Sequence, residues 1–196
     1  MPNAVITNRW TCRLVVLALL ATVVSCSTVY PRRNPRGETF PGVRGESLDG
    51  KAYSIPEDFR GQKTLLLIGY EMESQFDLDR WILGLHDAKI SLPVYEVPTI
   101  PGLVPGLFAK RINDGMRSGI PSEDWAIVVT VYEDGKKIAR FLGNESGRTA
   151  RVVLLDQDGK VLFFHDRGFS LRSLLDLKKT TEQFSHQITA GLEVRD

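Results

Sequence analysis

The sequence contains only two cysteines, Cys12 and Cys26, and both lie near its beginning. The long remainder of the chain therefore has no thiol with which to form a disulfide or to attack a substrate. Residues 26–196 are numerous enough to bury a core without disulfides. The distribution of cysteine excludes thiol-dependent redox catalysis from the globular part of the protein.

Other residues that carry chemistry are also scarce. The three histidines, His86, His165 and His186, are far apart, and none has a second ligand type at metal-binding spacing. The sequence has no glycine-rich phosphate loop and no recognisable nucleophile motif. We therefore predict no cofactor, no resident metal and no catalytic residue.

Acidic residues are absent from the first 25 positions, which carry Arg9 and Arg13 and then run apolar from Leu14 to Val24. A basic start followed by a short apolar stretch is typical of an export signal. A transmembrane helix needs about 20 apolar residues, more than this stretch supplies. The sequence predicts a signal peptide over residues 1–25.

The segment that follows the apolar stretch reads Val23-Val24-Ser25-Cys26-Ser27. It resembles the lipobox of bacterial lipoproteins, which implies cleavage before Cys26 and lipid attachment to its thiol. An ordinary signal peptide cut nearby is the alternative. Ser27 is not the aspartate that commonly retains such proteins at the inner membrane. We predict a lipid-anchored protein of the cell envelope, at the outer membrane and facing the periplasm.

The predicted mature chain has a nearly balanced charge. Loss of residues 1–25 removes two arginines and no acid, so the formal net charge falls from +1 to −1. A nucleic-acid-binding protein needs a basic face, so that function is not expected. Prolines and arginines between Ser27 and Phe40 suggest a flexible tether over residues 26–44, with its arginines solvated or resting on anionic lipid.

The remaining pattern alternates strands with helices and indicates one α/β domain over residues 45–196. The apolar run 64–70 predicts a central strand, and the spacing of Leu78, Trp81, Ile82 and Leu85 predicts a helix packed on it. Trp81 and Trp125 are expected in the core. The other expected elements are a hairpin over 47–55 around the turn Asp49-Gly50, strands over 92–97, 125–132, 151–156 and 160–165, a helix through Phe108, Ile112 and Met116, and a helix from Leu171 capped by Ser170. Turns are expected at Asp134-Gly135 and Asp158-Gly159.

The order of these elements, with Ser47-Leu48-Asp49-Gly50 and the segment 152–159, resembles the thioredoxin-like redoxins and peroxiredoxins. The resemblance implies a three-layer sandwich, with a central mixed sheet flanked by helices. It also places the family's reactive cysteine within 71–76, which reads Glu71-Met72-Glu73-Ser74-Gln75-Phe76, and its cis-proline at Ala150. The expected fold thus lacks the expected nucleophile, and no nearby histidine activates a serine in its place.

A second resemblance covers roughly residues 60–178. Gln75-Phe76 with Trp81, the segment 115–121, and Phe141-Leu142-Gly143-Asn144 are similar to the mitochondrial assembly factors for the membrane sector of ATP synthase, which are themselves redoxin-like without the reactive cysteine. Ala150-Arg151 and Leu162-Phe163 depart from that family's pattern. The resemblance implies a redoxin fold used for interaction; it does not identify the client.

We therefore expect a redox-inactive binding or assembly protein whose partner is an envelope protein. The alternative is a cysteine-free redoxin-fold enzyme, for example a metal-dependent hydrolase using the acidic residues between Glu71 and Asp79. Those carboxylates could instead serve only to stabilise a helix N-terminus, and Arg117 could merely cap its own helix. The predicted partner surface consists of Glu71, Glu73, Gln75, Phe76, Arg117, Pro121 and Ala150.

Overall fold

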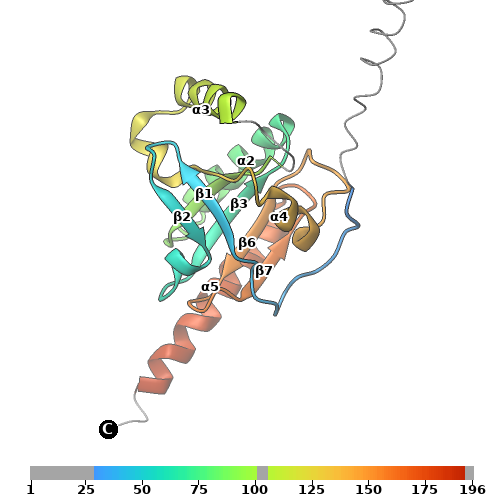
Figure 1. The fold of residues 1–196 in the computed structure, drawn as a ribbon. Coiled ribbons are helices and arrows are strands. Elements are labelled where there is room, and N and C mark those ends of the chain that lie inside the picture. The colour runs from blue at the N-terminus through green and yellow to red at the C-terminus, as the bar shows by residue number, and fades with distance from the viewer. Residues whose placement is uncertain (1–28, 101–105, 193–196) are drawn as a thin grey trace, which may run out of the picture.

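The computed structural model describes residues 29–100 and 106–192 (Figure 1). The predicted signal peptide and Cys26, the predicted site of lipid attachment, lie outside the described residues. No helix in the described part of the chain is both long and apolar enough to cross a membrane.

The central sheet has the strand order β4-β3-β6-β7. Strand β3 (Thr64–Gly69) is buried along its whole length, as its unbroken apolar run predicts. Strand β4 (Val94–Pro98) runs parallel to it, whereas β6 (Arg151–Leu155) and β7 (Val161–His165) continue the sheet in antiparallel order. The predicted central mixed sheet is confirmed.

A smaller sheet has the order β2-β1-β5. Strands β1 (Val43–Ser47) and β2 (Ala52–Ile55) form the hairpin predicted around Asp49-Gly50. The very short β5 (Val129–Thr130) pairs with β1, and isolated parallel bridges on either side of it reach β4 and Thr99. The hairpin is thereby held to the central sheet.

Helices cover both faces of the central sheet (Figure 1). Helices α2 (Gln75–Asp87) and α5 (Leu171–Leu192) pack on the face that carries Leu65 and Leu67. Helix α4 (Gly135–Leu142) and the hairpin pack on the opposite face, which carries Leu66 and Ile68. Alternate residues of β3 therefore belong to two separate cores, one on each face of the sheet, because successive side chains of a strand point to opposite faces. The predicted three-layer arrangement is present.

The described residues also contain three 3-10 helices and one further α-helix: η1 (Glu57–Phe59), η2 (Met72–Ser74), α3 (Gly106–Gly119) and η3 (Ser122–Ile127). The cap of α5 is as predicted, since the Ser173 backbone N–H donates to the Ser170 hydroxyl at 3.1 Å. Trp81 is completely buried in the α2 face of the core.

Three local predictions were wrong, the first being that Trp125 lies in the core, since it is only half-buried. Residues 125–132 were expected to form one strand, but Trp125 lies in η3 and its indole N–H donates to the Ile120 carbonyl at 2.9 Å, which holds the chain in a turn. Asp134-Gly135 was taken as a simple turn, but it opens α4. The buried Ile138 and Leu142 of this helix are one turn apart, and so short a segment carries little periodic signal.

The structure also differs from the predicted flexible tether. Residues 37–40 add backbone hydrogen bonds to the edge of β7, including Gly37 N–H to the Val161 carbonyl at 2.8 Å, and Phe40 is buried. The edge strand of a sheet has unpaired backbone N–H and C=O groups that can form these hydrogen bonds. This pairing explains why a proline-rich segment is held against the domain.

The arginines of this segment contact protein groups. Arg32 pairs with Asp166 at 2.7 Å, Arg33 pairs with Glu38, and Arg36 donates to the Phe164 carbonyl at 3.1 Å. The expectation that they lie free in solvent or on lipid is therefore corrected. They fasten the segment that we call the N-terminal strap, residues 30–40.

Candidate functional site

The candidate site lies at the end of the sheet where β3 stops and β6 begins. A tight turn leads from β3 into η2, since the Ser74 hydroxyl donates to the Glu71 carbonyl at 2.6 Å. Gly69 permits this turn, because a Cβ there would overlap the Ser74 hydroxyl. The segment expected to match the redoxin cysteine position, residues 71–76, is thereby placed at the start of α2.

Large apolar side chains are exposed at this helix start. Met72 is 90% exposed and Phe76 is 75% exposed, and they stand one helical turn apart. Glu71, Glu73 and Gln75, all predicted as surface residues, are exposed beside them. Apolar side chains of this size next to carboxylates are typical of an interaction surface rather than of a core.

A buried cationic group lies beneath this end of the sheet. Arg151 is only 3% exposed, and its guanidinium lies 4.7 Å from the centre of the Tyr70 ring. One of its terminal nitrogens donates to the Thr149 carbonyl at 2.6 Å, while Nε and the Tyr70 hydroxyl have no hydrogen-bond partner among the described residues. Burial lowers the pKa of Arg151 and raises that of Tyr70.

The sequence predicted no role for Arg151, which there is only a departure from the pattern of the ATP synthase assembly factors. The available signal was a charged residue opening the otherwise apolar strand Arg151–Leu155. A buried guanidinium without a direct carboxylate partner is energetically unfavourable unless its surroundings compensate it. The ring of Tyr70, the Thr149 carbonyl and the nearby carboxylates of Asp166 and Glu71 supply that compensation here.

Asp77 acts as a clamp between distant segments. Its two carboxylate oxygens accept the Ala150 N–H at 2.8 Å and the Phe169 N–H at 2.6 Å, and the residue is 8% exposed. A proline at position 150 would have no N–H to donate. The clamp therefore requires a residue with a backbone N–H at position 150, which Ala150 supplies, and Asp77 is committed to backbone groups.

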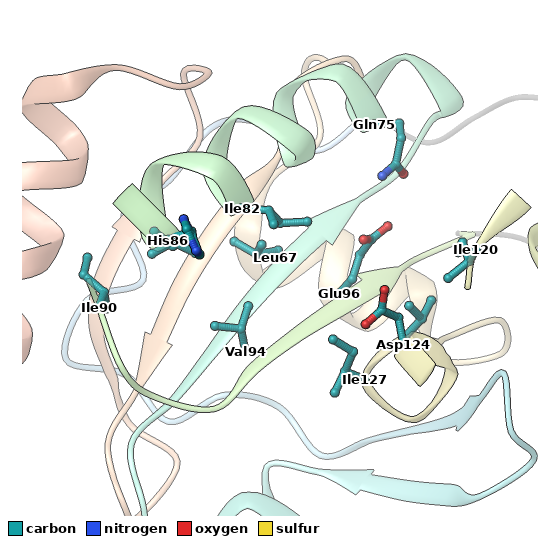
Figure 2. A pocket seen from close by; sticks show the side chains of 12 residues that line it. Leu67, Gln75, Ile82, His86, Ile90, Val94, Glu96, Ile120, Asp124 and Ile127 are labelled. Atoms are coloured by element: carbon teal, nitrogen blue, oxygen red, sulfur yellow. The ribbon is translucent and has the colours of Figure 1, made fainter. Parts of the chain in front are cut away.

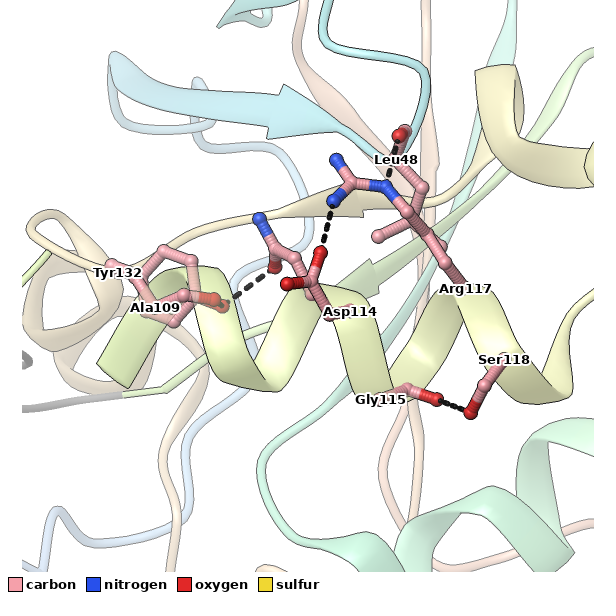
Figure 3. Close-up of polar contacts among 8 residues, drawn as sticks. Leu48, Ala109, Asp114, Gly115, Arg117, Ser118 and Tyr132 are labelled. Atoms are coloured by element: carbon pink, nitrogen blue, oxygen red, sulfur yellow. Dashed lines mark hydrogen bonds and ion pairs between the residues drawn. The ribbon is translucent and has the colours of Figure 1, made fainter. Parts of the chain in front are cut away.

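Two residues of the predicted partner surface have other roles. Ala150 is completely buried, so its side chain cannot contact a partner. Arg117 is half-buried, and its Nε donates to the Leu48 carbonyl at 2.7 Å while Nη1 pairs with Asp114 at 2.9 Å (Figure 3). Arg117 thus fastens α3 to the turn after β1. The structure corrects the expectation that it is an exposed binding group.

The other predicted site residues remain accessible. Pro121 is exposed, at the start of η3. Glu71 lies against Gly147, where a Cβ would overlap its carboxylate, so the loop before β6 closes over the turn after β3.

Within the described ranges, no group of three or more His, Cys, Asp or Glu side chains is placed to hold a metal ion.

Comparison with known proteins identifies the fold. No protein-family model and no curated protein matches the sequence. Among solved structures, the chain is similar to a thiol peroxidase from Chromobacterium violaceum, with 12% identity, a TM-score of 0.51, and coverage of 79% of this chain and 91% of the other. It is also similar to yeast Sco1 with copper bound, with 10% identity, a TM-score of 0.51, and coverage of 76% and 94%. At these identities the similarity shows the fold, which is thioredoxin-like.

Proposed function

We propose that this thioredoxin-like protein is a lipid-anchored, redox-inactive factor that binds or helps to assemble another protein at the cell envelope. The observation that carries the proposal is the composition of the helix start at which redoxins present a thiol. Here that position carries the exposed side chains of Met72 and Phe76. These groups can bury apolar area against a partner but cannot perform thiol chemistry.

The enzyme alternative has less support from the geometry. A hydrolase built on the acidic segment would need free carboxylates that converge on one point. Asp77 is instead saturated by two backbone N–H groups, and Glu71 is covered on one side by the Gly147 loop. The carboxylates of the acidic segment therefore do not form a common centre in the described structure.

The N-terminal strap supports a location of this surface close to a membrane. Only Ser27, Thr28 and Val29 separate Cys26 from Tyr30, whose carbonyl accepts the Asn144 N–H at 3.1 Å. Four residue steps reach at most about 14 Å. Asn144 belongs to the loop before β6, whose Gly147 lies against the side chain of Glu71. A lipid on Cys26 would hold this end of the sheet near the bilayer, so the proposed partner is a membrane-associated protein.

Replacing Cys26 by alanine tests the anchor. We expect the variant to lose acylation and to appear mainly in the soluble periplasmic fraction, because acyl chains supply the anchoring energy and the strap arginines are paired with protein groups. Fractionation and intact-mass measurement check this. Membrane retention of the variant, together with an unlipidated wild type, would refute the lipoprotein assignment.

Replacing Phe76 by serine tests the binding surface. We expect about tenfold weaker partner capture with little change in stability, because an exposed side chain contributes mainly to binding. Leu175→Ser is the matched control, since Leu175 is a 55% exposed apolar residue on α5. Crosslinking pull-downs compare the two variants with wild type.

If Phe76→Ser and Leu175→Ser captured the same amount of partner, the partner would not bind specifically around Phe76. Peroxide consumption or disulfide reduction by a Cys26→Ala protein would contradict the redox-inactive proposal. A protein-free blank sets the baseline for both assays.

A further inference from the structure

An apolar groove opens beside the candidate surface. It has a volume of about 330 Å³ and lies between α2, β4 and η3 (Figure 2). Leu67 and Val94 form its floor, Ile82 and Leu85 line the α2 side, and Ile127 lines the η3 side. This volume is at the lower end of the range that binds small molecules or single side chains of a partner.

Two carboxylates face this apolar space. Glu96 projects from β4 and Asp124 from η3, and Figure 2 shows both on the same side of the groove. Glu96 is half-buried, and burial raises the pKa of its carboxyl, with a further contribution from nearby Asp79 and an opposing hydrogen bond from Gln75. The groove thus combines an apolar wall with negative charge.

The groove lining in the described ranges contains no lysine or arginine that could pair with these carboxylates. The one basic side chain among the described lining residues is His86 on α2. A carboxyl pKa raised in the folded state means that ionisation of Glu96 disfavours folding above its usual pKa of 4.5. A carboxylate that lines an apolar groove under that penalty is a candidate for ligand recognition.

We propose that this groove binds a lysine side chain from an apolar segment of the partner, with the ammonium between Glu96 and Asp124 and the alkyl stem along Ile82 and Leu85. The inference rests on the proposed binding function and specifies the chemistry of the partner. A flexible alkyl chain that ends in a compact point charge matches an apolar wall with carboxylates at one side.

Octylamine is a suitable probe because it reproduces the alkyl stem and the ammonium group. We expect it to bind the mature protein about tenfold more tightly than octanol at pH 7, since a hydrogen bond between an ammonium and a carboxylate is stronger than one between neutral groups. Octanoate should bind more weakly than either. Amide shifts of Leu67, Ile82 and Val94 in titrations followed by NMR locate the site.

The variants Glu96→Gln and Asp124→Asn should each reduce octylamine affinity about fivefold or more and leave octanol affinity unchanged. Glu96→Gln is expected to fold, because removal of this charge relieves its desolvation. Asp158→Asn, at the exposed β6–β7 turn, is the matched control and should bind like wild type.

Octylamine binding no tighter than octanol, or equal binding by wild type and both groove variants, would overturn the inference. Shifts confined to residues outside the groove would also overturn it. These results are separable from the proposed function, because partner capture that depends on Phe76 would persist if only the lysine site were wrong.

Discussion

Replacing Trp81 by alanine is expected to lower the free energy of unfolding by about 3–5 kcal/mol, because truncation leaves a cavity in a closed core. Trp81 is completely buried, and its ring packs edge-to-face on Phe169 with centroids 5.3 Å apart. It joins α2 to the segment before α5. Urea unfolding of wild type and variant measures the difference.

Two variants show whether the loss comes from packing. Trp81→Phe should be much less destabilising than Trp81→Ala, because it retains most of the ring volume and the indole N–H has no hydrogen-bond partner among the described residues. Leu83→Ala on the same helix should change stability by under about 0.5 kcal/mol, since Leu83 is 65% exposed. A loss below about 1 kcal/mol for Trp81→Ala would contradict the buried packing.

Replacing Asp77 by alanine is expected to cost several kcal/mol, on the order of 3–5. The substitution leaves the Ala150 and Phe169 N–H groups without their acceptor, and each charged hydrogen bond contributes about 1.5–3 kcal/mol. The same variant should loosen the start of β6 and the approach to α5. Hydrogen exchange at these two amides should accelerate more than exchange in the middle of β3.

Asp79→Ala is the matched control for Asp77, because it removes a carboxylate from the same helix turn but from an exposed position. Its effect should stay under about 0.5 kcal/mol. If the two variants were equally stable, the carboxylate of Asp77 would be acting only through its charge near the helix N-terminus. The clamp would then have no energetic importance.

The clamp depends on a backbone N–H at position 150, where the resemblance to redoxins leads one to expect a proline. In the expected redoxin arrangement, a proline at position 150 would donate no hydrogen bond. Here Ala150 donates to Asp77, and Arg151 follows it into the buried strand. The end of the sheet is therefore closed by polar contacts within the chain, while Met72 and Phe76 remain exposed at its surface.

Much of the fold followed from local patterns. The continuous apolar run of β3 and the helical spacing around Trp81 predicted a covered strand and its packed helix, and both are present. The short helix α4 and η3 escaped prediction because their few buried positions are set by neighbours in space. The strap escaped because proline and arginine content says nothing about a free sheet edge nearby.

The candidate site divides in the same way. The exposed segment Glu71–Phe76 was predicted by analogy with the cysteine position, whereas the burial of Ala150 and the attachment of Arg117 to Leu48 were not. Hydrogen-bond partners far apart in sequence leave no trace in spacing or composition. The same holds for the groove, whose lining comes from β3, β4, α2 and η3.

The sequence by itself determined the absence of a thiol beyond Cys26, the alternation of strands and helices, and the apolar positions that form two core faces. These features follow from amino-acid composition and from the spacing of apolar residues along the chain, which do not depend on how distant segments pack together. Only the tertiary structure decided that Asp77 clamps Ala150, that Arg151 lies against the Tyr70 ring and that Glu96 and Asp124 lie on the same side of an apolar groove. Each of these depends on which distant segments the packed sheet brings together.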